Sequence, residues 1–200
     1  RVMMSGLPDP GPVSLSGIRL VISDIDGVMT DGGLHYDENG HCFERFHVRD
    51  KLGIQMLEKS GIRVAALSER NSESLRKLLD DWGVSLFRLG VQDKVAAGRE
   101  LMQAVSVSPA DTACIGDDYT DLPVFAECAV SFSVADAPDF VRQAATYTLS
   151  RRGGDGALLE ASDRILPAVS RDQAISPHRC ARSQESDKPQ KVLFLQDKTR

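Results

Sequence analysis

Short apolar runs alternate with amphipathic stretches along most of this chain. The apolar runs are typical of buried strands of a parallel sheet, and they cover residues 19–24, 62–67, 84–89, 113–115, 130–134 and 147–149. Between them, helical periodicity predicts helices that begin near residues 49, 72 and 93 and helices over residues 122–127, 138–144 and 156–166. This alternation indicates an α/β fold with a doubly wound, mainly parallel sheet and right-handed crossovers.

Apolar faces mark the expected inner sides of the first three helices. Leu52, Met56 and Leu57 share one face of the first helix, which we expect to end before Gly61. The second helix stops at Gly83, and the inner faces of the second and third helices consist of Leu75, Leu78, Leu79 and Trp82, and of Val95, Leu101 and Met102.

A hairpin separates the first strand from the first crossover helix. Residues 33–37 and 42–47 are typical of two short strands, and Glu38-Asn39-Gly40 predicts an Asn-Gly hairpin turn between them. Because the hairpin follows the first strand directly, we expect it to lie near the carboxyl end of that strand. No segment between the later strands is long enough to form a separate cap domain.

One domain accounts for the patterned part of the chain. Residues 1–16 are rich in Pro, Gly and Ser and predict a flexible lead-in, which leaves residues 17–168 as the domain. Residues 169–200 are mostly polar and charged without periodicity, which predicts a disordered tail.

Composition narrows the expected partners and location. With 42% hydrophobic residues and a formal net charge of −5, the chain is typical of a globular protein that binds neither nucleic acid nor a membrane surface. No apolar stretch reaches membrane-spanning length, and the N-terminal residues lack the apolar segment of a signal peptide. Scattered cysteines without a Cys-x-x-Cys pair favour a reduced, cytoplasmic protein.

Two carboxylates lie at the end of the first predicted strand. Residues i and i+2 of an extended strand point to the same side, so Asp24 and Asp26 are expected to project together where open α/β sheets bind ligands. Carboxylates this close repel each other, and a bound Mg²⁺ would relieve the repulsion. The alternative is a pair of solvated aspartates that open a turn.

Polar side chains also follow the later strands at equivalent positions. Ser68 ends the second strand, Lys94 opens the helix after the third, and aspartates follow the fourth, namely Asp117, Asp118 and Asp121. In a doubly wound sheet these positions lie along one crevice. Together they match phosphoryl transfer: Asp24 could be a nucleophile and Asp26 a general acid and base. Ser68 would bind a phosphate oxygen, and Lys94 would neutralise charge on the transferred group.

These residues together resemble the four-motif signature of the haloacid dehalogenase superfamily. The motifs are Asp24-Ile25-Asp26-Gly27, Ser68, Lys94 and Gly116-Asp117-Asp118-x-x-Asp121, and the resemblance runs from about residue 18 to residue 167. It implies that Asp24 forms an aspartyl phosphate and that Asp26 is the general acid and base. It also implies Mg²⁺ bound by Asp24, the backbone carbonyl of Asp26 and Asp117. Ser68 and Lys94 would bind phosphate, with Asp118 and Asp121 in supporting roles.

A hairpin in place of a cap domain makes the resemblance more specific, to one subfamily. Phe46-His47-Val48-Arg49-Asp50 and Gly153-Gly154-Asp155-Gly156-Ala157 are similar to segments of the capless subfamily that contains the 3-deoxy-manno-octulosonate 8-phosphate phosphatases. This resemblance implies an acidic sugar phosphate as substrate and a place in lipopolysaccharide biosynthesis. It further implies a homotetramer in which hairpins pack together and a neighbouring subunit closes the site.

Two departures from the motifs of this subfamily leave the identity of the substrate sugar undecided. Ser68-Glu69-Arg70 stands where octulosonate enzymes usually have Thr-Gly-Arg, and it resembles relatives acting on nonulosonate (sialic acid or KDN) 9-phosphates. Leu159-Glu160 replaces a usual Arg-Glu pair, so one expected cation is missing.

Three further residues are candidate substrate ligands. Glu69 and Arg70 follow Ser68, and the guanidinium fork of Arg70 suits a sugar carboxylate. Arg49 either contacts the substrate or, with Asp50, caps the helix that begins there. The alternative function is a non-catalytic tetramerisation domain like those attached to acylneuraminate cytidylyltransferases, but retention of the whole chemical set favours an enzyme.

Overall fold

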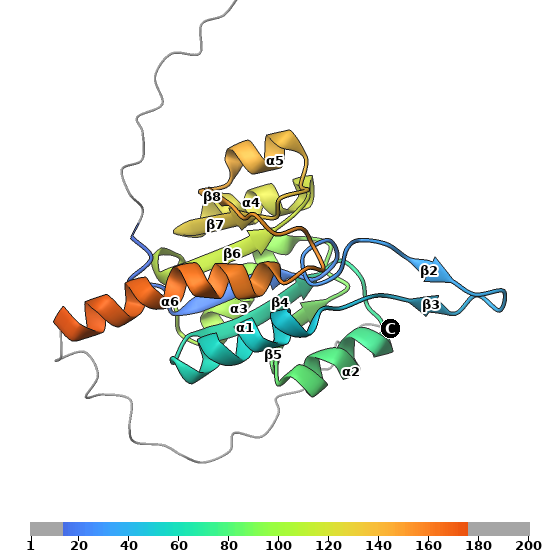
Figure 1. Cartoon of the computed structure of the whole chain (residues 1–200), viewed down its shortest axis with the longest axis horizontal. Helices are drawn as coiled ribbons and strands as arrows, with labels where there is room; N and C mark the ends of the chain where they lie inside the picture. The colour runs from blue at the N-terminus through green and yellow to red at the C-terminus, as the bar shows by residue number, and fades with distance from the viewer. Residues whose placement is uncertain (1–13, 176–200) are drawn as a thin grey trace, which may run out of the picture.

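A six-stranded sheet lies at the centre of the protein, whose computed structural model describes residues 14–175 (Figure 1). The strand order is β5-β4-β1-β6-β7-β8, and every neighbouring pair is parallel. The strands are β1 (Leu20–Asp24), β4 (Arg63–Ser68), β5 (Leu86–Leu89), β6 (Thr112–Gly116), β7 (Val130–Ser133) and β8 (Tyr147–Thr148). The predicted doubly wound, mainly parallel sheet is confirmed.

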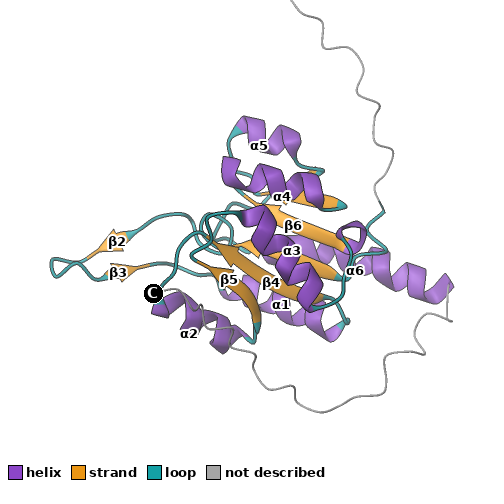
Figure 2. Ribbon diagram, turned by 180° about the vertical axis from the view of Figure 1, so that it is seen from behind, coloured by secondary structure: helices purple, strands orange, loops and turns teal. Residues whose placement is uncertain are grey.

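Helices cover both faces of this sheet. They are α1 (Val48–Lys59), α2 (Glu73–Trp82), α3 (Lys94–Ala104), α4 (Leu122–Glu127), α5 (Asp139–Ala144) and α6 (Ala157–Ile175), with short 3-10 turns at Pro109–Asp111 and Tyr119–Asp121. The helices α1 and α6 pack together on one face, and α3 and α4 lie on the opposite face (Figure 1 and Figure 2). None of the helices within residues 14–175 is long and apolar enough to cross a membrane.

The central strand is buried along its whole length. Leu20 and Ile22 of β1 are at most 1% exposed, and burying an aliphatic side chain of this size contributes about 1.5–3 kcal/mol. The expected inner positions of α2 and α3 are also buried at Leu75, Leu79, Leu101 and Met102. Because β4 and β6 flank β1 in parallel, the carboxyl ends of these three strands meet at one edge of the sheet.

The buried face of α1 differs from the predicted one. Leu57 is buried as expected, but Leu52 is 47% exposed and Ile54 lies in the core instead. Gly53 lies against α6, since a Cβ there would come within 2.8 Å of the Leu159 backbone. The prediction that Leu52 is a core residue is therefore wrong, because close packing of α1 on α6 turns the helix toward Gly53.

The predicted hairpin projects from the body of the protein (Figure 1 and Figure 2). Its strands, β2 (His35–Tyr36) and β3 (Cys42–Phe43), are shorter than expected. The turn predicted at Glu38-Asn39-Gly40 joins them, and this prediction is confirmed. The backbone N–H of Asp37 donates to the His41 carbonyl, and Gly40 alone among the loop residues has a positive φ, of 81°. The loop thus has three residues and ends in a left-handed glycine.

The last helix continues past the predicted domain end. A helix ending at residue 166 and a tail from residue 169 were expected, but α6 ends at Ile175. Ile165 and Val169 are buried, so the apolar face that holds α6 on the sheet extends past that boundary. The remainder of the expected tail and residues 1–13 of the expected lead-in lie outside the described residues.

Candidate active site

The carboxyl ends of β1 and β6 and the start of α3 bring three charged side chains into one buried site. Asp24 is the last residue of β1, Lys94 is the first residue of α3, and Asp121 lies in the turn after β6. Their side chains are only 5–7% exposed. The structure therefore gathers residues from three of the four predicted motifs around Asp24.

Lys94 is held between two carboxylates. Its Nζ donates to Asp121 Oδ1 over 2.8 Å and lies 3.1 Å from Asp24 Oδ2. Burial lowers the pKa of Lys94, but the two carboxylates more than offset this effect and hold that pKa above its ordinary value. Lys94 is consequently a cation beside Asp24 at neutral pH.

Asp121 organises the turn that follows β6. Its Oδ2 accepts hydrogen bonds from the backbone N–H groups of Asp117 and Asp118, at 2.9 and 3.2 Å. The Asp118 carboxylate in turn accepts the N–H of Tyr119 at the start of the 3-10 turn. Both residues therefore shape the loop that carries Asp117.

Asp117 completes a cluster of three carboxylates. Oxygen atoms of Asp24, Asp117 and Asp121 lie within 4.8 Å of one another. Burial, and after it the charge of Asp121, raises the pKa of Asp24 well above its ordinary value. The same causes, joined by Asp118, raise the pKa of Asp117 to about 7. One ammonium does not neutralise this many carboxylates in a buried site.

The donor set fits Mg²⁺, which favours hard oxygen ligands. Gly27 leaves room for one of them, since a Cβ at this residue, whose φ is 87°, would lie 2.0 Å from Asp117 Oδ2. Both oxygens of Asp121 accept hydrogen bonds, and Asp24 Oδ1 accepts the Ile25 N–H over 2.9 Å while Asp24 Oδ2 faces Lys94.

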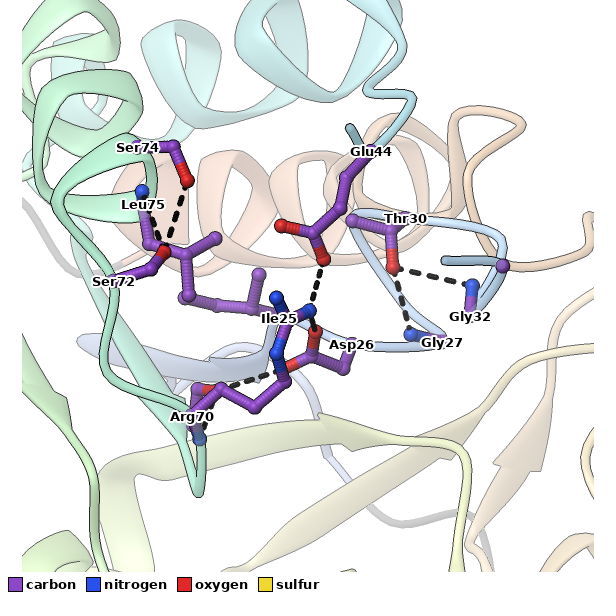
Figure 3. A network of polar contacts seen from close by, with 12 residues as sticks. Ile25, Asp26, Gly27, Thr30, Gly32, Glu44, Arg70, Ser72, Ser74 and Leu75 are labelled. Carbon is purple, nitrogen blue, oxygen red and sulfur yellow. Dashed lines mark hydrogen bonds and ion pairs between the residues drawn. The ribbon is translucent and has the colours of Figure 1, made fainter. Parts of the chain in front are cut away.

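Asp26 follows Asp24 by two residues but has different partners (Figure 3). Its Oδ2 accepts a hydrogen bond from the Ser68 hydroxyl over 2.7 Å, and its Oδ1 accepts one from Arg70 Nη1 over 2.7 Å. Ser68 Oγ also accepts the backbone N–H of Arg70 at 2.9 Å. Ser68 of the second predicted motif therefore binds the Asp26 carboxylate of the first motif.

Arg70 also binds a residue of the hairpin segment. Its Nη1 donates to Glu44 Oε1 as well as to Asp26 (Figure 3). The bond to Glu44 raises the pKa of Arg70; burial opposes this effect and Asp26 adds to it. Sequence reasoning missed Glu44, because a carboxylate in a polar hairpin carries no signal of its own.

Polar contacts brace the loop after β1. Thr30 Oγ1 accepts the backbone N–H groups of Gly27 and Gly32 at 3.1 and 3.2 Å (Figure 3). From the late glycine motif, Gly154 N–H donates to the Val28 carbonyl over 2.9 Å. This contact gives the late glycine motif a structural role beside the site. The sequence interpretation did not single out Thr30.

Two predicted substrate ligands lie apart from these contacts. Arg49 and Glu69 are exposed, and within the described residues neither side chain makes a hydrogen bond or an ion pair. The N-cap of α1 is His47, whose Nδ1 accepts the Arg49 N–H over 3.1 Å. Capping by Asp50 is therefore wrong, because Asp50 is buried and accepts the Leu158 N–H of α6 over 2.9 Å.

Known proteins share both the sequence and the fold. The profile of the haloacid dehalogenase-like hydrolases matches residues 88–159. A 3-deoxy-D-manno-octulosonate 8-phosphate phosphatase of Haemophilus influenzae is 52% identical over 154 residues, which are 77% of this chain and 86% of the relative.

Solved structures agree with this result. The cobalt-bound deoxy-D-mannose-octulosonate 8-phosphate phosphatase of Haemophilus influenzae superposes with a TM-score of 0.76 and 48% identity, covering 82% of this chain and 96% of that one. The Moraxella catarrhalis 3-deoxy-D-manno-octulosonate 8-phosphate phosphatase, in complex with magnesium, phosphate and KDO, has a TM-score of 0.75 and 30% identity, covering 82% and 95%. On this similarity of sequence, fold and carboxylate site, the chain belongs to the haloacid dehalogenase-like hydrolases.

Proposed function

We propose that this chain is a Mg²⁺-dependent phosphatase that hydrolyses the phosphomonoester of 3-deoxy-D-manno-octulosonate 8-phosphate. The observation that carries the proposal is the buried Asp24 carboxylate, with the Lys94 ammonium 3.1 Å away and the oxygens of Asp117 and Asp121 within 4.8 Å. Relatives that match most of the chain and bear this activity in their names support the choice of substrate.

Asp24 is the nucleophile in this proposal. A carboxylate oxygen attacks phosphorus, the bond from phosphorus to the sugar oxygen breaks, and an aspartyl phosphate forms on Asp24. Lys94 stabilises negative charge on the transferred group, and Asp121 holds Lys94 in place through the 2.8 Å hydrogen bond. Asp24, Asp117 and the Asp26 carbonyl would hold Mg²⁺, which when bound offsets further charge on the phosphoryl group.

Asp26 moves the protons. It protonates the leaving sugar oxygen in the first step and takes a proton from the attacking water in the second. In that second step the bond from phosphorus to Asp24 breaks, inorganic phosphate leaves and the free Asp24 carboxylate returns. The contacts with Ser68 and Arg70 hold both Asp26 oxygens, which supports a fixed orientation for these transfers.

The proposed substrate ligands lie at and just after the end of β4 and at the starts of α1 and α3. Ser68 and Lys94 bind the phosphate, and Arg70 presents a guanidinium for the sugar acid. Glu69 and Arg49 are exposed and therefore free to contact the sugar.

A homotetramer is the proposed working form. The hairpin projects from the body (Figure 1) and exposes Leu34, Tyr36 and Phe43, which are 46–66% exposed, while Val48 on α1 is 78% exposed. Apolar side chains gathered in this way favour contact with other subunits. We propose that hairpins pack together and that a neighbouring subunit closes the site, in the cytoplasm and as a step of lipopolysaccharide biosynthesis.

A substrate panel tests the reaction and the sugar together. Phosphate release with Mg²⁺ is measured for octulosonate 8-phosphate, nonulosonate and N-acetylneuraminate 9-phosphates, and hexose phosphates. We expect the highest kcat/KM for octulosonate 8-phosphate. A preference for a 9-phosphate would replace the proposed sugar with the nine-carbon alternative. Release from none of them, with or without EDTA, would favour the non-catalytic tetramerisation domain.

A further inference from the structure

Glu44 is a buried charge in an otherwise exposed segment. Its side chain is 5% exposed, whereas its neighbours Phe43 and Arg45 are exposed. A buried carboxylate is stabilised only when it is paired. Arg70 is the partner of Glu44 within the described residues.

The contact joins the hairpin segment to the residue proposed as general acid. One nitrogen atom, Nη1 of Arg70, donates both to Glu44 and, over 2.7 Å, to Asp26 Oδ1 (Figure 3). Two carboxylates from different parts of the chain therefore share one guanidinium. Movement of Arg70 away from Glu44 would also change its contact with Asp26.

The other groups around Asp26 are less free to move than the Arg70 side chain. Ser68 is fully buried at the end of β4, and its Oγ bonds both Asp26 and the backbone N–H of Arg70. The Arg70 side chain is flexible by nature and 33% exposed. Within the described residues, Glu44 is the other carboxylate that this guanidinium contacts.

The segment that carries Glu44 is itself anchored beside the site. Phe46 forms an antiparallel bridge with Thr30, and Thr30 accepts the N–H groups of Gly27 and Gly32 in the loop after β1. Glu44 therefore starts from a fixed backbone position two residues from this bridge.

We propose that Glu44 is a positioning residue: it holds Arg70 against Asp26 and so orients the carboxylate that protonates the leaving oxygen. The inference rests on the proposed phosphatase function and on Asp26 as its acid. It adds to that function a residue of the hairpin segment, which contributes through Arg70 and not by touching the substrate.

Substrates whose leaving groups differ in their need for a proton distinguish a positioning role of Glu44 from a purely structural one. An alkoxide leaving group needs a proton, whereas p-nitrophenolate leaves readily without one. We expect Glu44→Ala to lower kcat/KM about tenfold or more both for octulosonate 8-phosphate and for glycerol phosphate, an alkyl ester with no carboxylate for Arg70 to bind. For p-nitrophenyl phosphate we expect a loss of less than about threefold, because misplacing a general acid removes part of its contribution. Glu44→Gln, which keeps a hydrogen-bond acceptor and the side-chain volume, should show the same selective loss to a smaller extent.

Two further variants complete the experiment. Arg45→Ala is the matched control, since Arg45 is the next residue and its ion pair goes to Asp31 instead, at 3.2 Å; we expect kcat/KM to stay within about twofold, as for most surface pairs. Glu44→Ala combined with Arg70→Ala should be no slower than Arg70→Ala alone, because Glu44 acts through Arg70.

An equal loss on the alkyl phosphates and on p-nitrophenyl phosphate, a loss confined to octulosonate 8-phosphate, a loss no larger than that of Arg45→Ala, or additive effects of Glu44→Ala and Arg70→Ala would overturn the inference. Failure of the proposed substrate is a separate result. If the parent enzyme hydrolyses only other alkyl phosphates, such as glycerol phosphate, the same comparison is made with that alkyl phosphate and still decides the role of Glu44.

Discussion

Lys94 Nζ donates a hydrogen bond to Asp121 Oδ1 over 2.8 Å, and both side chains are 5% exposed. The pair joins the start of α3 to the turn after β6, and it also places the ammonium 3.1 Å from Asp24 Oδ2. Lys94 is the cation that offsets the carboxylate cluster when no metal is bound. The charge balance of the site therefore depends on Lys94 together with Mg²⁺.

Removing Lys94 should destabilise the protein most when metal is absent. Breaking a buried pair by deleting one partner costs about 3–5 kcal/mol, because the other charge stays buried without compensation. We expect Lys94→Met to lose about this much unfolding free energy in EDTA, measured by urea denaturation, and clearly less in Mg²⁺. The control is Lys77→Met, an exposed position on α2. Equal losses with and without Mg²⁺ would contradict this account of the site.

Mg²⁺ should stabilise the folded protein through Asp117. A ligand that binds only the folded state adds about 2.7 kcal/mol when its concentration is one hundred times its Kd. We expect Mg²⁺ to raise the Tm of the parent protein and to have little effect on Asp117→Asn. Asp163→Asn is the control, since Asp163 is exposed on α6. A Tm of Asp117→Asn that responds to Mg²⁺ like that of the parent would exclude Asp117 as a ligand.

The predictable parts of this molecule are those that local pattern determines. The buried strand that ends at Asp24, the strand that ends at Ser68 and the helix that begins at Lys94 lie where the apolar runs and helical spacing placed them. Parallel strands end at the same edge, so the meeting of Asp24, Lys94 and Asp121 follows from the topology. The residues that end these strands could therefore be predicted from the sequence.

Features that depend on distant contacts were not predictable. The inner face of α1 is set by the approach of Gly53 to α6, which lies more than a hundred residues later in the chain, and this approach leaves Leu52 exposed. The pairing of Glu44 with Arg70 likewise joins the hairpin segment to the loop after β4. Neither contact leaves a periodic trace in the sequence.

Asp26→Asn should slow the reaction without unfolding the protein. Loss of a general acid and base typically costs about 10²–10⁴-fold in rate. We expect a fall of that size in kcat for octulosonate 8-phosphate, measured by phosphate release. Asp31→Asn, in the same loop but paired with Arg45, is the control. A fall of less than about tenfold in Asp26→Asn would show that another group transfers the proton.

Asp50 should make stability depend on pH. It is fully buried, its Oδ2 has no hydrogen-bond partner in the described part of the chain, and burial raises its pKa to about 6. The folded state therefore binds this proton more tightly than the unfolded chain. This contribution to the free energy of unfolding is present below about pH 4 and is lost as the pH rises toward 6. The loss amounts to about 3 kcal/mol.

Asp50→Asn isolates this effect, since it keeps an acceptor for the Leu158 N–H and cannot ionise. We expect the unfolding free energy of the variant, relative to the parent, to be higher at pH 8 than at pH 4 by about 3 kcal/mol. Urea denaturation at both pH values measures the difference. A constant difference between the two proteins would mean that Asp50 does not titrate in this range.

The most direct test of the central claim compares the parent protein with Asp24→Asn on octulosonate 8-phosphate, each with Mg²⁺ and with EDTA. Asparagine keeps the size of the side chain but is not a nucleophilic carboxylate. Lys94 keeps Asp121 as its partner in this variant, so we expect the protein to stay folded. We predict that the parent releases phosphate only in Mg²⁺ and that Asp24→Asn releases none. Thermal unfolding curves should show that both proteins are folded. Near-normal release by Asp24→Asn, or release by the parent that EDTA does not change, would contradict the proposed aspartyl-phosphate mechanism.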